Sequence, residues 1–154
     1  MEAFFAERYS VHLLAIRAVM RMKAIGLIAE LERGASAALP RINELRDKLT
    51  PALAHLICDY LDSGVTAIDI MEASQDPLSV STFIPGGPSL VSDGTWVWRK
   101  DLSYFVRNYL VWLDEHFVSH VLHSGTSMPE VLVVSKCSEI KRAYQEAREG
   151  KSDE

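Results

Sequence analysis

Three histidines on one predicted helix are the first residues whose type and spacing suit chemistry. His116, His120 and His123 stand in the run EHFVSHVLH at positions i, i+4 and i+7. This spacing puts three imidazoles on one helix face, where they could ligate zinc with a fourth ligand from elsewhere. The run has no H-E-x-x-H pattern, and its apolar residues supply a buried stripe that leaves the histidines on the wet side. We therefore predict no metal, and a metal-dependent hydrolase using this trio remains an alternative.

Other catalytic patterns are weak or missing. Asp69 and Glu72 could act as an acid and base pair if buried together, although such acids usually lie on the surface. The run IPGGPSLVSDG lacks the Lys-Ser/Thr end of a P-loop and the spacing of a dinucleotide fingerprint. Cys58 and Cys137 form no C-x-x-C pair and suit buried free thiols in a reducing compartment, with a disulfide between them as the alternative. We expect no catalytic residue and no cofactor, and we predict that the protein is not an enzyme.

The charge distribution is strongly uneven. The chain has 154 residues and a net charge of −5, yet no lysine or arginine occurs from Leu49 to Trp98. A base-free acidic segment is a poor nucleic-acid binder, because phosphate contacts need cations. It suits docking of a basic protein partner, although a merely solvated surface explains it equally well. The residues that we predict to contact a partner are Asp62, Asp69, Glu72, Asp76 and Asp93.

The apolar pattern predicts helices at both ends of the chain. Residues 3–33 carry apolar positions at helical spacing up to Gly34, and a second helix follows over 40–63. Pro51 interrupts that second helix and Thr50 can cap its continuation, so we expect a kink or two abutting helices. A capping-box pattern at Ser127 and Glu130 begins a last helix that runs to residue 148.

The middle of the chain is mixed. Residues 65–71 favour a short strand over a short helix, and residues 75–89 have the prolines and glycines of a loop. Beyond the hairpin that follows, we expect helices before and after the run LVWL, the second capped by Asp114 and ended at Gly125. The prediction is one α+β domain over 1–154, predominantly helical with a small antiparallel sheet. Its parts are two helices within 1–63, a mixed region over 64–125 and a C-terminal helix over 127–148.

The stretch SDGTWVWRKDL looks like a corner of the fold rather than a site. Asp93-Gly94 predicts a two-residue type I′ turn in a hairpin near 89–98, which would pair Val91 with Trp96. A tryptophan then anchors the hairpin and Asp101 caps the next helix. The residues assigned to this structural motif are Gly94, Trp96, Trp98, Asp101 and Tyr104.

Charged residues also bear on location. Five of them interrupt the apolar N-terminal run well short of the ~20 apolar residues that a membrane span needs. The run lacks a basic start and a small-residue cleavage site, so it is not expected to be a signal peptide. We predict a cytoplasmic protein without membrane contact. A homodimer formed through the long first helix remains a further alternative, with an adaptor or chaperone role.

Residues 86–121 resemble a pattern found in small bacterial proteins, some of them similar to immunity proteins encoded beside polymorphic toxins or type VI secretion effectors. The matching positions cover about a quarter of the chain and are Asp93, Gly94, Trp96, Trp98, Asp101, Leu102, Tyr104, Val106, Tyr109, Val111, Leu113 and Phe117. The chain departs from the pattern at Asp114, where a proline is common. The resemblance implies a cytoplasmic, non-catalytic protein that binds and neutralises one cognate toxin, and it carries over no contact residue.

Overall fold

A mixed four-stranded sheet forms the centre of the fold in the computed structural model, which describes residues 21–124 and 129–151. β1 (Lys23–Ala24) pairs in parallel with β6 (Trp96–Arg99), and the order continues antiparallel through β5 (Leu90–Ser92) to β2 (Val65–Ile68). A second sheet consists of β3 (Ala73–Asp76) and β4 (Ser79–Pro85). The fold is thus mixed α+β, and the prediction of a predominantly helical fold with one small antiparallel sheet is wrong.

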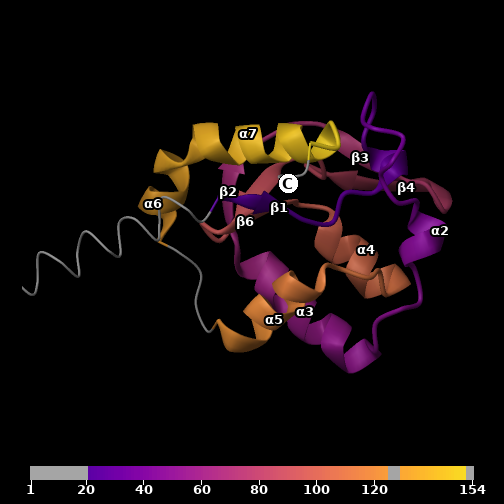
Figure 1. The fold of residues 1–154 in the computed structure, drawn as a ribbon. Helices are drawn as coiled ribbons and strands as arrows, with labels where there is room; N and C mark the ends of the chain where they lie inside the picture. The colour runs from indigo at the N-terminus through magenta and orange to yellow at the C-terminus, as the bar shows by residue number, and fades with distance from the viewer. Residues whose placement is uncertain (1–20, 125–128, 152–154) are drawn as a thin grey trace, which may run out of the picture.

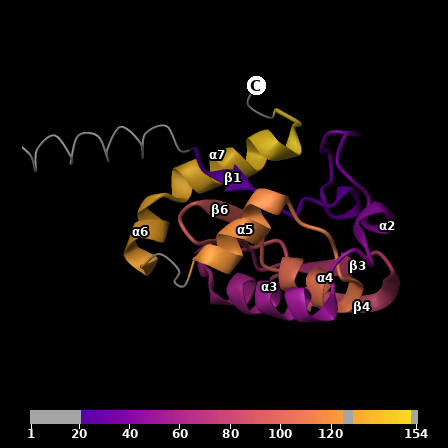
Figure 2. The ribbon, with the colours of Figure 1, turned by 60° about the horizontal axis from the view of Figure 1, so that its bottom comes forward.

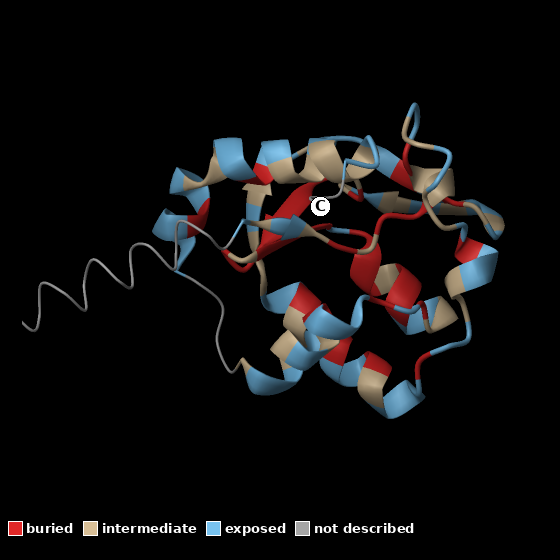
Figure 3. Ribbon diagram, viewed as in Figure 1, coloured by how far each residue is buried: buried red, intermediate tan, exposed pale blue. Residues whose placement is uncertain are grey.

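Helices cover both faces of the four-stranded sheet. α3 (Pro51–Ser63), α4 (Leu102–Tyr109) and α5 (Glu115–His123) lie on one side, and α6 (Glu130–Ser135) and α7 (Cys137–Arg148) on the other (Figures 1 and 2). The central strands are accordingly buried on both faces, as Figure 3 shows in red.

Alternation along β5 and β6 divides the core in two. Val91, Trp96 and Trp98 pack with the α3–α5 layer. Leu90 and Val97 point to the opposite face and pack with apolar side chains of α6 and α7. Successive side chains of a strand point to opposite faces, so a short hairpin can supply both layers.

The N-terminal segment differs most from its prediction. Residues 1–20 of the predicted helix lie outside the described residues, while residues 21–33 hold β1 and a short 3₁₀ helix, Ala29–Leu31, instead of α-helix. Gly26 adopts a left-handed φ of 71°, and a Cβ there would lie 2.4 Å from Leu102 Cδ2. Parallel pairing with β6 and the close approach of this backbone to α4 override the local helical pattern.

The predicted break in the second helix is confirmed. α2 (Ile42–Leu45) ends before α3 begins at Pro51, and the Thr50 hydroxyl accepts a hydrogen bond from the Leu53 amide at 3.3 Å. Proline at the first helical position is favourable because its missing N–H would have no helical partner there. The predicted strand after Gly64 is also confirmed as β2.

The hairpin forms where it was predicted but in another register. Val91 pairs with Trp98 rather than Trp96, and four residues connect the paired positions Ser92 and Val97. Only Gly94, at 93°, has a positive φ in this turn, whereas a type I′ turn needs two. The Asp93 carboxylate accepts hydrogen bonds from the amides of Thr95 and Trp96, which stabilises the longer loop.

The segment predicted as a loop, 75–89, is largely a strand. β4 occupies Ser79–Pro85, and the residues taken as loop signals stand at its ends. Pro77 lies in the turn between β3 and β4, while Gly86, with a φ of 66°, begins the turn that leads to β5. Pro85 pairs with Ala73 at the end of the ladder, where a missing N–H is tolerated.

The helices near the C-terminus match the prediction in part. Asp114 caps α5 as predicted, with its carboxylate 2.7 Å from the His116 amide. The predicted end at Gly125 and the cap at Ser127 lie outside the described residues. The single predicted C-terminal helix is instead two, α6 and α7, which meet at Lys136. Within the described ranges, no helix has the length and apolar character needed to cross a bilayer.

Candidate functional site

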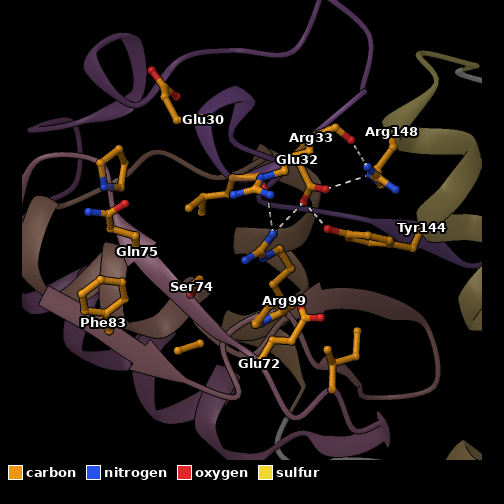
Figure 4. A pocket seen from close by; sticks show the side chains of 15 residues that line it. Glu30, Glu32, Arg33, Glu72, Ser74, Gln75, Phe83, Arg99, Tyr144 and Arg148 are labelled. Carbon is orange, nitrogen blue, oxygen red and sulfur yellow. Dashed lines mark hydrogen bonds and ion pairs between the residues drawn. The ribbon is translucent and has the colours of Figure 1, made fainter. Parts of the chain in front are cut away.

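A cavity of about 590 Å³ lies between the β3–β4 hairpin, the segment of residues 30–33, the end of β6 and α7. Its volume is within the range of about 300–1,000 Å³ that is usual for ligand clefts. Two runs of consecutive residues border it, 72–75 from the hairpin and 30–33 from the N-terminal segment (Figure 4). Arg99, Tyr144 and Arg148 complete the polar part of the lining.

Glu32 is the centre of a buried network on one wall of this cavity. Its carboxylate lies 3.5 Å from Arg99 Nη1 and 2.9 Å from Arg148 Nε, and it accepts a short hydrogen bond from the Tyr144 hydroxyl (Figure 4). The Glu32 side chain is only 3% exposed. Because a buried carboxylate needs partners for its charge, this network fixes α7 to the N-terminal segment.

Asp101 neutralises Arg99 from the other side. Arg99 donates from Nε to Asp101 Oδ1 at 3.0 Å and from Nη2 to Oδ2 at 2.7 Å, which is the bidentate geometry of a strong pair. Arg99 Nη1 donates to the Leu31 carbonyl, and Ser74 donates to Asp101 Oδ2 at 2.7 Å. Asp101 begins α4 as predicted, but its side chain makes no capping bond because Arg99 and Ser74 occupy it.

The network shifts the pKa values of its members. Burial would lower the pKa of Arg99, but the hydrogen bonds and charge of Asp101, together with Glu32, outweigh burial and raise it. Burial raises the pKa of Tyr144, and the negative charge of Glu32 raises it further. Both side chains therefore keep their protons at neutral pH.

The cavity also has side chains without partners. Glu72, on the hairpin side, is exposed, and its carboxylate has no hydrogen-bond or ion-pair partner among the described residues. Arg33, in the opposite run, is exposed, and only its carbonyl is engaged, by Arg148. Phe83 lines the cavity and is 59% exposed. The deep arginines are neutralised internally, so the charges available to a ligand are those at the mouth.

The five acids predicted to contact a partner do not share one surface. Asp62 lies on α3 and pairs with Arg107 at 3.0 Å. Asp76 is fully buried and accepts hydrogen bonds from the hydroxyls of Tyr104 and Tyr109. Asp93 is also buried, inside its loop, whereas Asp69 and Glu72 are exposed between β2 and β3.

The three histidines are not brought together. His116 and His123 are exposed, while His120 Nε2 lies 2.8 Å from Asp93 Oδ2 and 3.1 Å from the Tyr60 hydroxyl. No group of three metal-ligating side chains with suitable geometry occurs in the part of the chain that the structure describes. The described residues therefore lack the histidine cluster that a metal-dependent hydrolase would need. His120 instead joins α5 to the hairpin.

The aromatic residues of the structural motif join the hairpin to the helices, although the register of the hairpin and the cap at Asp101 differ from the prediction. Trp96 and Trp98 are buried, and both rings contact Phe117 of α5, with centroids 5.4 Å and 5.9 Å apart. Tyr104 donates to Asp76 and so connects α4 to the β3–β4 hairpin. Gly94 supplies the left-handed position of the turn.

Sequence reasoning named Asp101 as a helix cap but missed the buried network around it. Glu32, Arg99, Tyr144 and Arg148 come from distant parts of the chain, and no local motif joins them. The available signals were Glu32, which follows the apolar residues of the run LIAELER, and Arg99, which ends the buried strand WVWR. A charged residue in such a context is expected to need a buried partner, although its identity is not apparent from the sequence.

Comparisons with known proteins do not add to this picture. Searches against models of protein families, curated proteins and solved structures found no match. The function is therefore inferred from the sequence and the geometry of this chain.

Proposed function

We propose that the protein is a binding protein that captures a basic partner, acting in the cytoplasm as the immunity protein of a secreted toxin. Its contact surface is the loop and hairpin of residues 69–83, named here the 69–83 surface. The 69–83 surface lies inside the base-free interval from Leu49 to Trp98, so a cationic partner meets no like charge from it.

The observation that carries the proposal is the exposure of large apolar side chains along the same segment as two exposed acids. Met71 is 97% exposed and stands between the exposed residues Asp69 and Glu72. Val80 is 78% exposed, and Phe83 of β4 is 59% exposed. Exposed large apolar side chains with polar residues around them are typical of protein-interaction sites.

A second exposed apolar group supports the proposal less well. α6 exposes Val131, Leu132 and Val134 when only the described residues are considered. Residues 125–128, which precede its N-cap Pro129, lie outside them. The 69–83 surface, by contrast, lies in a continuous described stretch and combines apolar and acidic groups. It is therefore the better surface for a basic partner.

The test is a charge reversal with a matched control. The partner is captured with the full chain from its own cells, or expressed from the adjacent reading frame, and titrated by calorimetry against the double variant Asp69→Arg/Glu72→Arg. We expect its affinity to fall at least tenfold and its binding to become less salt-sensitive.

The control is Asp59→Arg/Glu139→Arg, which changes the net charge equally at exposed positions outside the 69–83 surface. It should bind the partner as the wild type does. If both double variants lose affinity equally, the effect comes from net charge and not from the 69–83 surface. If Asp69→Arg/Glu72→Arg binds the partner fully, the 69–83 surface is not part of the interface. For the toxin-neutralising role, co-expression should show rescue of growth by the wild type and the control only.

A further inference from the structure

We propose that the cavity beside the hairpin is a strand-addition groove, in which an extended segment of the partner pairs with the free edge of β3 and presents a basic side chain to Glu72. This inference rests on the proposed function, since it specifies how the partner is held. It follows from the hydrogen-bond direction of β3, the two walls of the cavity and the unpaired carboxylate at its mouth.

The backbone of β3 is half unpaired. Gly86 N donates to Glu72 O at 2.8 Å, and Ser74 pairs with Ile84 two positions further along the same ladder. Alternate residues of an antiparallel strand direct their backbone groups to the partner strand, so those of Ala73 and Gln75 point away from β4. β4 is the only strand paired with β3 among the described residues, which leaves an open row of donors and acceptors.

The cavity lies along that open edge. Ala73 and Gln75 lie on one face of the two-stranded sheet and Ser74 on the other, yet all three line the cavity, whereas β4 contributes only Phe83. Because residues from both faces of β3 border the cavity, the cavity must run along the edge of this strand. Residues 30–33 form the opposite wall (Figure 4), so the groove lies between two consecutive runs of chain. Four residues of extended strand span about 13 Å.

The charges select the occupant. Arg99 donates to Asp101 and to the Leu31 carbonyl and lies 3.5 Å from Glu32, so two carboxylates already balance its charge. Glu72 is the carboxylate at the mouth without a described partner, and Phe83 offers an exposed ring nearby. A lysine or arginine on the added strand forms an ion pair with the Glu72 carboxylate. Arg33 on the facing wall repels this basic side chain. Recognition is therefore by main-chain pairing with one basic side chain.

The probe for this groove is a set of linear peptides selected from a random phage-displayed library against the immobilised full chain. The selected peptides should be rich in lysine or arginine. Their binding should protect the amides of residues 73 and 75 from hydrogen exchange in the wild-type protein. Ala73→Pro removes one outward N–H without removing a bond to β4, and it should weaken peptide binding at least tenfold. Ala73→Val keeps that N–H and should bind within about twofold of the wild type.

Side-chain variants separate the charge from the main-chain pairing. Glu72→Gln should lower the affinity of the basic peptides severalfold, and Arg33→Gln should leave it unchanged or raise it. The inference is overturned if no peptide is selected, if selected peptides bind Ala73→Pro as well as Ala73→Val, or if exchange protection falls elsewhere. The exchange measurement needs no variant, so it decides the matter even if Ala73→Pro fails to fold.

The two proposals can fail separately. If the natural partner binds Ala73→Pro normally but not Asp69→Arg/Glu72→Arg, the 69–83 surface stands and strand addition falls. If the partner binds both variants normally, the proposed function falls as well.

Discussion

Replacing Asp101 by asparagine tests the buried network most directly. The change keeps the shape of the side chain but removes the charge that faces the Arg99 guanidinium at 2.7 Å and 3.0 Å. Both side chains are almost inaccessible, with Arg99 7% and Asp101 1% exposed. The variant therefore leaves a buried cation with one carboxylate fewer, and water cannot replace it.

The magnitude follows from burial and from what remains. Removing one partner of a buried ion pair costs about 3–5 kcal/mol. Glu32 stays 3.5 Å from Arg99 and supplies part of the lost charge, so we expect the lower end, about 3 kcal/mol. For a chain of this size each kcal/mol lowers Tm by about 2–4 °C, which gives a fall of about 6–12 °C.

The assay is urea denaturation followed by tryptophan fluorescence, together with calorimetric melting. The matched control is Asp62→Asn, which breaks the exposed Arg107–Asp62 pair of similar length, 3.0 Å. Exposed pairs contribute about 0–1 kcal/mol, so this variant should be nearly neutral. If Asp101→Asn lowers the free energy of unfolding no more than Asp62→Asn does, the inference that this buried network stabilises the fold is refuted.

Three further outcomes are expected. Gly64→Ala should destabilise the fold by about 1–3 kcal/mol in urea denaturation, because its Cβ would lie 2.5 Å from Trp98 Cζ2; unchanged stability would mean that the ring can move. Burial would raise the pKa of Asp76, but the hydrogen bonds from Tyr109 and Tyr104 lower it overall. The Asp76 carboxylate therefore stabilises the fold fully above about pH 4, and this stabilisation disappears as the pH falls through the lowered pKa of the folded state. Asp76→Asn should therefore lose less stability than the wild type between about pH 7 and about pH 3, and parallel curves would contradict this. The hydrogen bond to Asp76, with burial, raises the pKa of Tyr109 to about 12, so its contribution is full below about pH 10 and disappears as pH rises through the folded value. Ultraviolet titration should show one fewer tyrosine with the raised pKa in Tyr109→Phe, and an identical titration would count against the assignment.

Local signals predicted the parts of the fold that depend on near neighbours. Thr50 and Pro51 mark a helix start by their own side chains, and Asp114 does the same for α5. The Asp93-Gly94 turn was located correctly, but its register depends on the carboxylate of Asp93 bonding two amides of its own loop. A dipeptide signal does not contain that information.

Distant pairing accounts for what the sequence did not predict. β1 is a strand because β6 lies beside it, although the two are more than seventy positions apart in register, as Lys23 and Trp96 show. Of the side chains that line the cavity, only Glu72 was named from the sequence as a candidate contact, through the base-free interval. The buried partners Glu32 and Arg148 became evident only once α7 was placed against the N-terminal segment.

The attachment of α7 to the N-terminal segment has a consequence for how the chain folds during synthesis. Tyr144 reaches Glu32 across 112 positions, and β1 joins the sheet only beside β6. Contacts of such long sequence separation form slowly, because the loop between them must close first. The segment that holds β1 and Glu32 therefore has to wait until β6 and α7 have been made, and β1 waits longest for its partner among the described strands.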